Sequence, residues 1–130
     1  MPSEPTWLTA DAVIRFNQRA VADTGEPFIL RDAGLLESAL ARPKNHWSYG
    51  EDDLAVLAVS LLLGIAGNHP FGQGNKRAAF AAMEYFLFLN GYRLDAPDTV
   101  DLADQVVALI TGAMDESNFV FVLRESVTAL

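Results

Sequence analysis

Two apolar segments, separated by a short loop that contains glycine, constrain the fold of this chain more than any other feature. The first extends from Leu54 to Ala66, 13 positions interrupted only by Ser60 and Gly64. A membrane-spanning helix needs roughly 20 apolar residues, so this segment is predicted to be a helix buried on most of its sides. The second segment, residues 78–86, is rich in alanine and aromatic residues and also favours a helix. We expect the two helices to form the centre of an all-α domain.

Signals for helix ends place two further helices before this central pair. Thr9 is positioned to cap a helix over about residues 10–23. Its apolar face is expected to comprise Ala12, Val13, Phe16 and Ala20. Asp32 opens the next helix, which should end near Arg42 because a proline follows directly. Residues 43–50 are then predicted to form a loop.

The remaining helices are expected over about residues 51–67, 75–90 and 99–113, with a sixth capped by Ser117. Acidic residues at 51–53 favour a helix start, because the helix dipole is positive there. Residues 28–30 and 92–94 are predicted to be short extended pieces. The sequence therefore predicts a compact six-helix, all-α fold in which residues 1–130 form a single domain.

Composition excludes several classes of function. The formal net charge is -8, which argues against a general affinity for nucleic acid because such binding starts from a basic surface. The chain has no cysteine, so disulfides and thiolate metal sites are excluded. The first residues lack the basic and apolar regions of a signal peptide. We expect a cytoplasmic protein that does not associate with membranes.

The loop between the apolar segments reads His69-Pro70-Phe71-Gly72-Gln73-Gly74-Asn75-Lys76-Arg77. A helix begins within it, and the N-terminus of a helix carries unpaired N–H groups and partial positive charge. Gly72 and Gly74 let the backbone approach a ligand closely. Asn75 adds an amide that can cap the helix or contact phosphate.

Lys76 and Arg77 are badly placed for the helix dipole, which favours cations at the other end of a helix. Their position is easier to explain if an anion binds between them and the backbone N–H groups. The combination predicts a binding site for the phosphates of a nucleotide.

His69 adds a proton acceptor to this loop. A neutral imidazole can take the proton of a hydroxyl group, which could then attack a phosphorus atom while the loop holds the developing charge. Phe71 is predicted to insert into the core and fix the loop. The arrangement is typical of an enzyme that transfers a phosphate-containing group.

The stretch from His69 to Arg77 resembles the signature of the Fic/Doc family, in which a histidine is followed by phenylalanine, Gly-Asn and an arginine. Lys76 resembles the Doc branch, the death-on-curing toxins, where Asn-Lys-Arg replaces the Asn-Gly-Arg of Fic enzymes. The opening helix, residues 28–40 and the two apolar helices also look Doc-like.

The resemblance implies a six-helix fold and transfer of a group from ATP to a protein hydroxyl. In the Doc branch this is phosphate transfer to a threonine of translation elongation factor Tu, which arrests translation. The implied roles are His69 as the base and Gly72, Gly74, Asn75, Lys76 and Arg77 as phosphate ligands. A flap made of Glu26, Pro27, Phe28, Ile29 and Leu30 is implied to align the target chain.

Two positions depart from the family pattern. Phe80 stands where Fic enzymes carry another arginine, which favours the Doc branch and phosphate transfer over AMP transfer. Gln73 stands where the family has the acidic ligand of Mg²⁺, and its neutral carbonyl should bind this metal more weakly. AMP transfer and a catalytically weak, antitoxin-binding module therefore stay open as alternatives.

The family's internal inhibitory motif is a serine or threonine followed four residues later by glutamate and then glycine or asparagine. No serine or threonine of this chain satisfies the pattern. The resemblance then implies restraint by a separate antitoxin protein.

Overall fold

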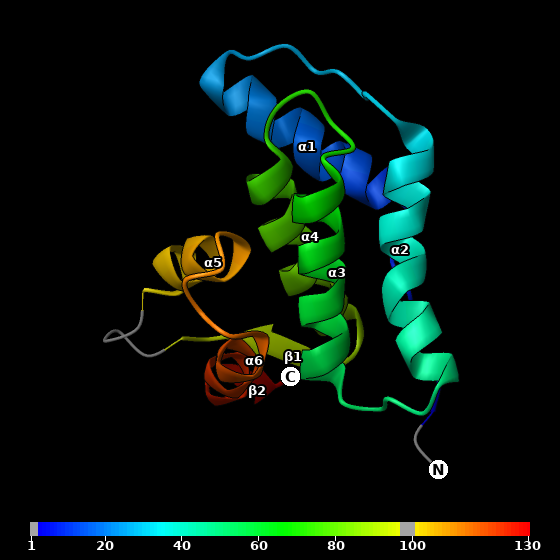
Figure 1. Ribbon diagram of the computed structural model, residues 1–130, viewed down its shortest axis with the longest axis vertical. Helices are drawn as coiled ribbons and strands as arrows, with labels where there is room; N and C mark the ends of the chain where they lie inside the picture. The colour runs from blue at the N-terminus through cyan, green and yellow to red at the C-terminus, as the bar shows by residue number, and fades with distance from the viewer. Residues whose placement is uncertain (1–2, 97–100) are drawn as a thin grey trace.

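The computed structural model describes residues 3–96 and 101–130. Within these ranges the fold is all-α, with six helices and one small two-stranded sheet (Figure 1). The helices are α1 (Ala10–Thr24), α2 (Ala33–Ser48), α3 (Leu54–Asn68), α4 (Asn75–Leu89), α5 (Leu102–Ile110) and α6 (Glu116–Glu125). The strands are β1 (Tyr92–Leu94) and β2 (Val127–Ala129). None of the described helices is long and apolar enough to span a membrane.

Helices α3 and α4 lie side by side at the centre of the molecule, as the sequence predicts (Figure 1). Ten of the 15 residues of α3 are buried, because its apolar residues surround the whole helix. Helix α2 approaches α3 closely at Gly64, where an added Cβ would lie 3.2 Å from the Cα of Ala39. Small residues at this crossing allow the two helix backbones to pack together.

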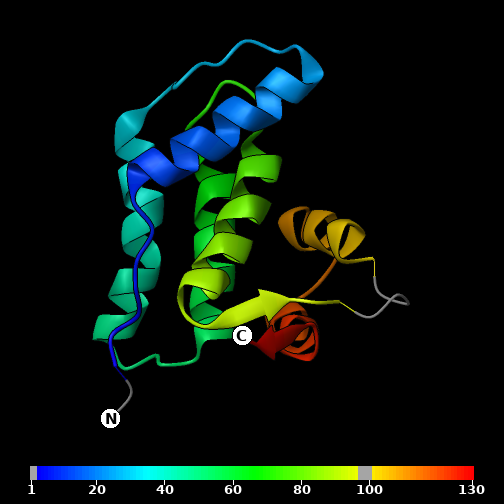
Figure 2. The ribbon, with the colours of Figure 1, turned by 180° about the vertical axis from the view of Figure 1, so that it is seen from behind.

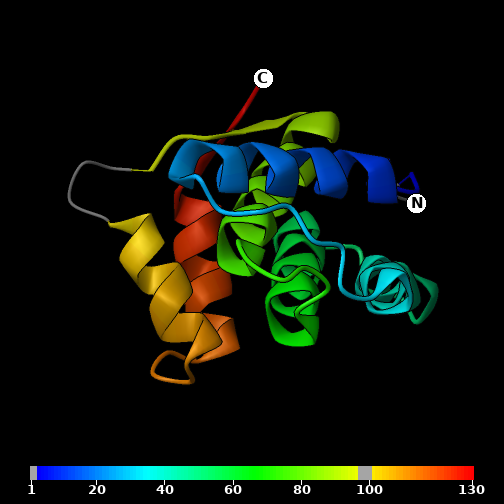
Figure 3. The same ribbon diagram turned by 90° about the horizontal axis from the view of Figure 1, so that it is seen from above.

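Helix α1 crosses α4, and in the view from above it lies along one side of the central pair (Figure 3). Thr9 caps it as predicted, by accepting a hydrogen bond from the N–H of Ala12. Its buried residues are Val13, Asn17 and Val21, spaced four apart. The predicted face was therefore wrong in part: of its four residues only Val13 is buried, and a polar Asn17 occupies the centre of the true face.

Helix α2 does not end before Pro43, which corrects the predicted loop over residues 43–50. Asp32 caps the helix as expected, but the helix continues through Pro43 to Ser48. A proline inside a helix removes one backbone hydrogen bond and clashes with the preceding turn. Pro43 is buried here, so packing against the rest of the fold outweighs the local cost.

Several other boundaries differ from the prediction. Helix α3 begins at Leu54 because Asp53 acts as its N-cap, so the acids at 51–53 precede the helix. Helix α5 covers only Leu102–Ile110, and the predicted positions 99–100 lie outside the described residues. Helix α6 begins at Glu116, one residue before the predicted cap.

The predicted extended piece at residues 92–94 is strand β1, and its antiparallel partner β2 was not predicted. Seen from behind, the sheet lies at the same end of the molecule as the start of α3, far from the loop between α3 and α4 (Figure 2). The sheet therefore closes one end of the fold, and the loop with the unusual residues lies at the other end.

Candidate functional site

Five residues of the α3–α4 loop and of the first turn of α4 line one open hollow of ≈ 280 Å³, called here the His69 hollow. They are His69, Gly74, Asn75, Lys76 and Arg77. The hollow brings the predicted proton acceptor next to four of the five predicted phosphate ligands. Lys76 is exposed and makes no hydrogen bond or ion pair to any described residue, so its charge is free to meet a ligand.

No side chain in the described part of the chain caps the start of helix α4. Its N-cap residue is Gly74, which adopts a left-handed conformation with φ +74° that favours glycine. Among the described residues, none accepts a hydrogen bond from the five consecutive backbone N–H groups of residues 73–77. These five groups are called here the anion nest. They are hydrogen-bond donors at a helix N-terminus, where the helix dipole also places partial positive charge.

The loop is fixed from inside by Phe71 and Asn75. Phe71 is 1% exposed and belongs to the hydrophobic core, as predicted. The side chain of Asn75 accepts a hydrogen bond from the N–H of Phe71 at 3.0 Å and donates one to its carbonyl at 2.9 Å. The Asn75 amide therefore holds the loop, and only its backbone N–H belongs to the anion nest.

The predicted flap runs along the loop as an extended segment. The N–H of Gly72 donates to the carbonyl of Ile29 at 2.8 Å, and Leu30 forms an isolated antiparallel bridge with Phe71. A Cβ at Gly72 would lie 3.0 Å from the Cβ of Ile29, so a larger residue here would have to push the flap outward. Gly72 thus gives its N–H to the flap rather than to an anion, and it does not line the His69 hollow.

The outer surface of the flap is apolar. Phe28, Ile29 and Leu30 are 39%, 48% and 37% exposed. The ring of Phe28 nevertheless packs against the ring of Phe71, with 6.3 Å between the ring centroids. An extended, exposed segment of this kind can present apolar side chains to another chain.

His69 ends α3 in a left-handed conformation, with φ 50° and ψ 57°. Apart from glycines, it is the one described residue with positive φ, a conformation that is uncommon for other residues but tolerated by histidine. The guanidinium of Arg31 donates two hydrogen bonds to the carbonyl oxygen of His69, from Nε at 2.9 Å and from Nη2 at 2.6 Å. The backbone is therefore clamped while the imidazole stays exposed.

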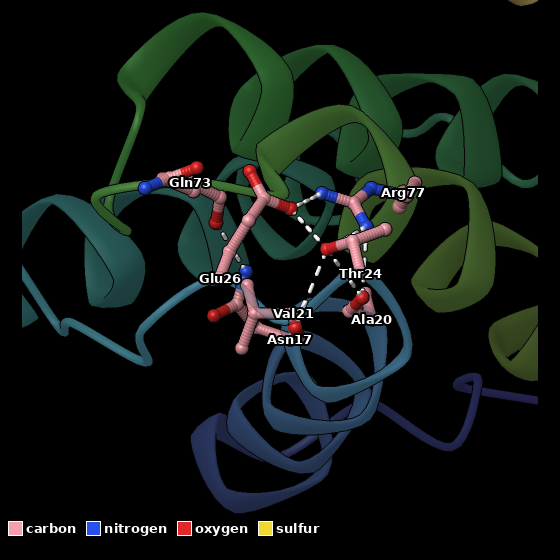
Figure 4. A network of polar contacts seen from close by, with 7 residues as sticks. All are labelled: Asn17, Ala20, Val21, Thr24, Glu26, Gln73 and Arg77. Atoms are coloured by element: carbon pink, nitrogen blue, oxygen red, sulfur yellow. Dashed lines mark hydrogen bonds and ion pairs between the residues drawn. The ribbon is translucent and has the colours of Figure 1, made fainter.

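Arg77 is tied to the end of α1 and to the start of the flap. Its guanidinium donates to Glu26 Oε1 at 2.6 Å and to the Ala20 carbonyl at 2.7 Å, and Thr24 Oγ1 accepts at 3.3 Å (Figure 4). Hydrogen bonds from Thr24 and then from Arg77 hold the pKa of Glu26 below the ordinary glutamate value of 4.5. The guanidinium and the carboxylate are 43% and 29% exposed, so both charges remain within reach of a ligand in solution.

Asn17 reaches the loop from α1, a contact that the sequence did not predict. Its Nδ2 donates to the backbone carbonyl of Gln73 at 2.7 Å (Figure 4). The residue is 0% exposed, and its Oδ1 is buried without a hydrogen-bond partner in the described part of the chain. The signal in the sequence that could have indicated this contact is the polar Asn17 between Val13 and Val21 on the apolar face of α1.

The residues present do not fit a metal site built from protein carboxylates. In the described ranges no three His, Cys, Asp or Glu residues are grouped so that they could hold a metal ion. Gln73 carries a neutral amide, whereas Mg²⁺ prefers carboxylate and phosphate oxygens. The Oε1 atom of Glu26 already accepts hydrogen bonds from Thr24 and Arg77.

A second hollow adjoins the first on the side of α5. It measures ≈ 310 Å³ and is lined mainly by apolar atoms of α4 and α5. Its residues are Lys76, Arg77, Phe80, Ala103, Val106 and Val107. Lys76 and Arg77 line both hollows, so a charged site and an apolar site lie next to each other.

Comparison with known proteins agrees with the motif. A sequence model described as the Fic/DOC family matches residues 7–87, which is more than half of the chain. The matched region contains α1 to α3, the loop and most of α4.

Two curated relatives are similar over this region. The chain is 43% identical over 81 residues to "Toxin Doc" of Mycolicibacterium smegmatis, covering 60% of this chain and 62% of that protein. It is 31% identical over 96 residues to "Protein kinase doc" of Escherichia phage P1, covering 73% of this chain and 75% of that protein. The match to the first relative therefore spans less than two thirds of that protein's length. The match to the second spans three quarters of its length.

Proposed function

The chain belongs to the Fic/DOC family, and from this membership and the site geometry we propose that it transfers phosphate from ATP to a hydroxyl group of a protein target. The observation that carries the proposal is the start of α4, where five backbone N–H groups find no acceptor within residues 3–96 and 101–130 and lie beside an exposed histidine. This arrangement supports binding of a polyphosphate close to a proton acceptor.

In the proposed reaction His69 accepts the proton of the target hydroxyl. The hydroxyl oxygen forms a bond to the γ-phosphorus of ATP, and the bond from that phosphorus to the bridging oxygen breaks, so that ADP leaves. Charge develops on the phosphoryl oxygens and the leaving oxygen during this step. The anion nest, with Lys76 and Arg77, supplies hydrogen-bond donors for that charge. No step is assigned to a metal ion, because the donor set does not fit one.

The two adjoining hollows support a nucleotide rather than a free phosphate as the ligand. In this proposal the phosphates lie in the His69 hollow and the nucleoside lies against Phe80 in the apolar hollow. Lys76 and Arg77 line both hollows and would contact the ligand where its charged and apolar parts meet. Phe80 adds an aromatic side chain, which can pack against a base.

The flap is proposed to hold the segment of the target that carries the hydroxyl. Its exposed apolar side chains and its pairing with the loop support this role. We propose elongation factor Tu as the target, with a threonine as the acceptor, so that the protein acts as a toxin that arrests translation. The relatives named as a Doc toxin and a Doc protein kinase support the toxic action and the kinase reaction, and the choice of target is our own proposal. A separate antitoxin protein is proposed to restrain it.

Transfer of label from ATP tests the reaction. The protein is incubated with elongation factor Tu and ATP labelled on either the α- or the γ-phosphate. Label from the γ-phosphate alone is expected, with loss of transfer in His69→Ala. Label transferred only from the α-phosphate would instead establish AMP transfer, the alternative chemistry of the same site.

A second measurement separates an enzyme from a binding module. If the protein arrests growth when expressed without its antitoxin and His69→Ala does not, catalysis at His69 is required. Equal growth arrest by both proteins would argue for a catalytically weak module that acts by binding.

A further inference from the structure

The buried side chain of Asn17 donates a hydrogen bond to one peptide group of the anion nest. Asn17 lies on α1, 56 residues from the carbonyl of Gln73 to which it donates at 2.7 Å. The Gln73 carbonyl therefore points toward α1 (Figure 4). In a trans peptide the C=O and the following N–H point in opposite directions. The described chain contains no cis peptide, so the N–H of Gly74 points away from α1.

Without this contact the Gln73–Gly74 peptide would be free to turn over. Glycine populates positive and negative φ about equally well, so a peptide next to glycine has little intrinsic preference for one direction. Gly74 adopts φ +74° here. A reversed peptide would place a carbonyl oxygen, rather than an N–H group, toward a bound anion. The hydrogen bond from Asn17 thus favours the peptide direction in which an N–H group attracts the anion over the direction in which a carbonyl oxygen repels it.

The burial of Asn17 argues for such a role. Its Oδ1 has no partner among the described residues, and an unpaired buried polar atom destabilises a fold. An apolar side chain at the same place would avoid that cost, since Val13 and Val21 lie one turn away on the same face. The contact to Gln73 is the only hydrogen bond of the Asn17 side chain within the described chain.

We propose that Asn17 is a positioning residue that fixes the Gln73–Gly74 peptide with its N–H directed at the phosphates of the nucleotide. The proposal rests on the proposed function, because it assigns a direction to one donor of that same site. It adds a residue of α1, outside the loop motif, to the machinery that binds ATP.

Binding of ATP to two variants, Asn17→Leu and Asn17→Ala, tests the proposal. A hydrogen bond to a charged group is worth about 1.5–3 kcal/mol, so loss of the Gly74 donor should weaken ATP binding roughly tenfold or more. Ser60→Ala is the matched control, because Ser60 is buried with an unpaired oxygen but lies on α3. This control should bind ATP like the natural protein. Circular dichroism and thermal unfolding show that each variant is folded.

The amide resonance of Gly74 provides a second readout, which does not depend on the measured affinities. In ¹⁵N-labelled natural protein this resonance should shift when ATP is added, and in folded Asn17→Leu the shift should be lost or much reduced. An unchanged Gly74 resonance in the natural protein would overturn the proposal. So would natural ATP affinity in both Asn17 variants, or an equal loss of affinity in Ser60→Ala.

The variant Arg77→Ala distinguishes the two proposals. Suppose that the natural protein binds ATP and that Arg77→Ala weakens this binding. If the Asn17 variants then bind ATP as tightly as the natural protein, only the proposed role of Asn17 is wrong. If the natural protein does not bind ATP, the proposed function itself fails, and the role of Asn17 fails with it.

Discussion

The guanidinium of Arg77 lies 2.6 Å from the carboxylate of Glu26, so the last residue of the loop motif is paired with an acid at the start of the flap. The pair joins α4 to the segment that follows α1 and partly neutralises a cation that lines the His69 hollow. A phosphate that approaches Arg77 has to compete with this carboxylate. The pair therefore affects both the affinity for ATP and the attachment of the flap.

Replacing Glu26 should release Arg77 for the nucleotide. An exposed ion pair contributes little, so removing the competing carboxylate should have a modest effect, and Glu26→Gln should bind ATP about two- to fivefold more tightly than the natural protein. Isothermal titration calorimetry measures the change. Asp53→Asn is the matched control, because Asp53 pairs with Arg124 at the opposite end of α3. Weaker binding by Glu26→Gln would show instead that Glu26 orients Arg77 for its ligand.

The contribution of Glu26 to stability should depend on pH. Its pKa in the folded protein lies below the ordinary value of 4.5 because of Thr24 and Arg77. The carboxylate therefore stabilises the fold at neutral pH, and this contribution is lost as the pH falls from about 4.5 through the lowered pKa. Thermal midpoints of the natural protein and Glu26→Gln should differ at pH 7 and converge in acid. A difference that stays constant down to pH 2 would contradict this.

Gly74→Ala should damage the start of α4. Positive φ costs an alanine roughly 1–2 kcal/mol, and the added Cβ would lie 3.0 Å from Nδ2 of Asn17. We expect lower stability in chemical denaturation together with weaker ATP binding. Gly67→Ala is the control, because Gly67 lies in α3 with nothing near its Cβ position. That change should instead raise stability by about 0.5–1 kcal/mol. Similar losses in both variants would argue against a special conformation at Gly74.

Gln73→Glu should introduce a response to Mg²⁺. A carboxylate in the loop, together with the phosphates of ATP, provides the oxygen ligands that this ion prefers. The rate of label transfer should then rise with Mg²⁺ concentration more steeply than in the natural protein. Gln18→Glu adds the same charge to the exposed side of α1 and should leave the response unchanged. Identical Mg²⁺ curves for all three proteins would remove position 73 from metal binding.

Local sequence signals predicted the helices well where caps and periodicity agreed. Thr9 and Asp32 cap the helices that they were expected to cap, and α4 begins at the predicted Asn75. Pro43 shows the limit of such signals. Its local preference against helix is real, but its burial in α2 depends on neighbours that are distant in the sequence.

The motif residues were found in the sequence, but their partners were not. Arg31 clamps the His69 carbonyl across 38 positions, and Asn17 contacts Gln73 across 56. Glu26 lies 51 positions from Arg77. No local pattern encodes these distances, because they arise from the way α1 and the flap fold over the loop.

Local signals in the sequence were sufficient to predict six helices, the central apolar pair and the loop motif from His69 to Arg77, since propensities, caps and motif spacing act within a few residues. Which donors of that loop are paired follows only from the packing of the folded chain. The N–H of Gly72 is bonded to Ile29 and the side chain of Asn75 to Phe71, whereas the N–H groups of residues 73–77 have no acceptor among the described residues. Hydrogen bonds between distant segments depend on how those segments pack, and only the folded chain fixes that packing.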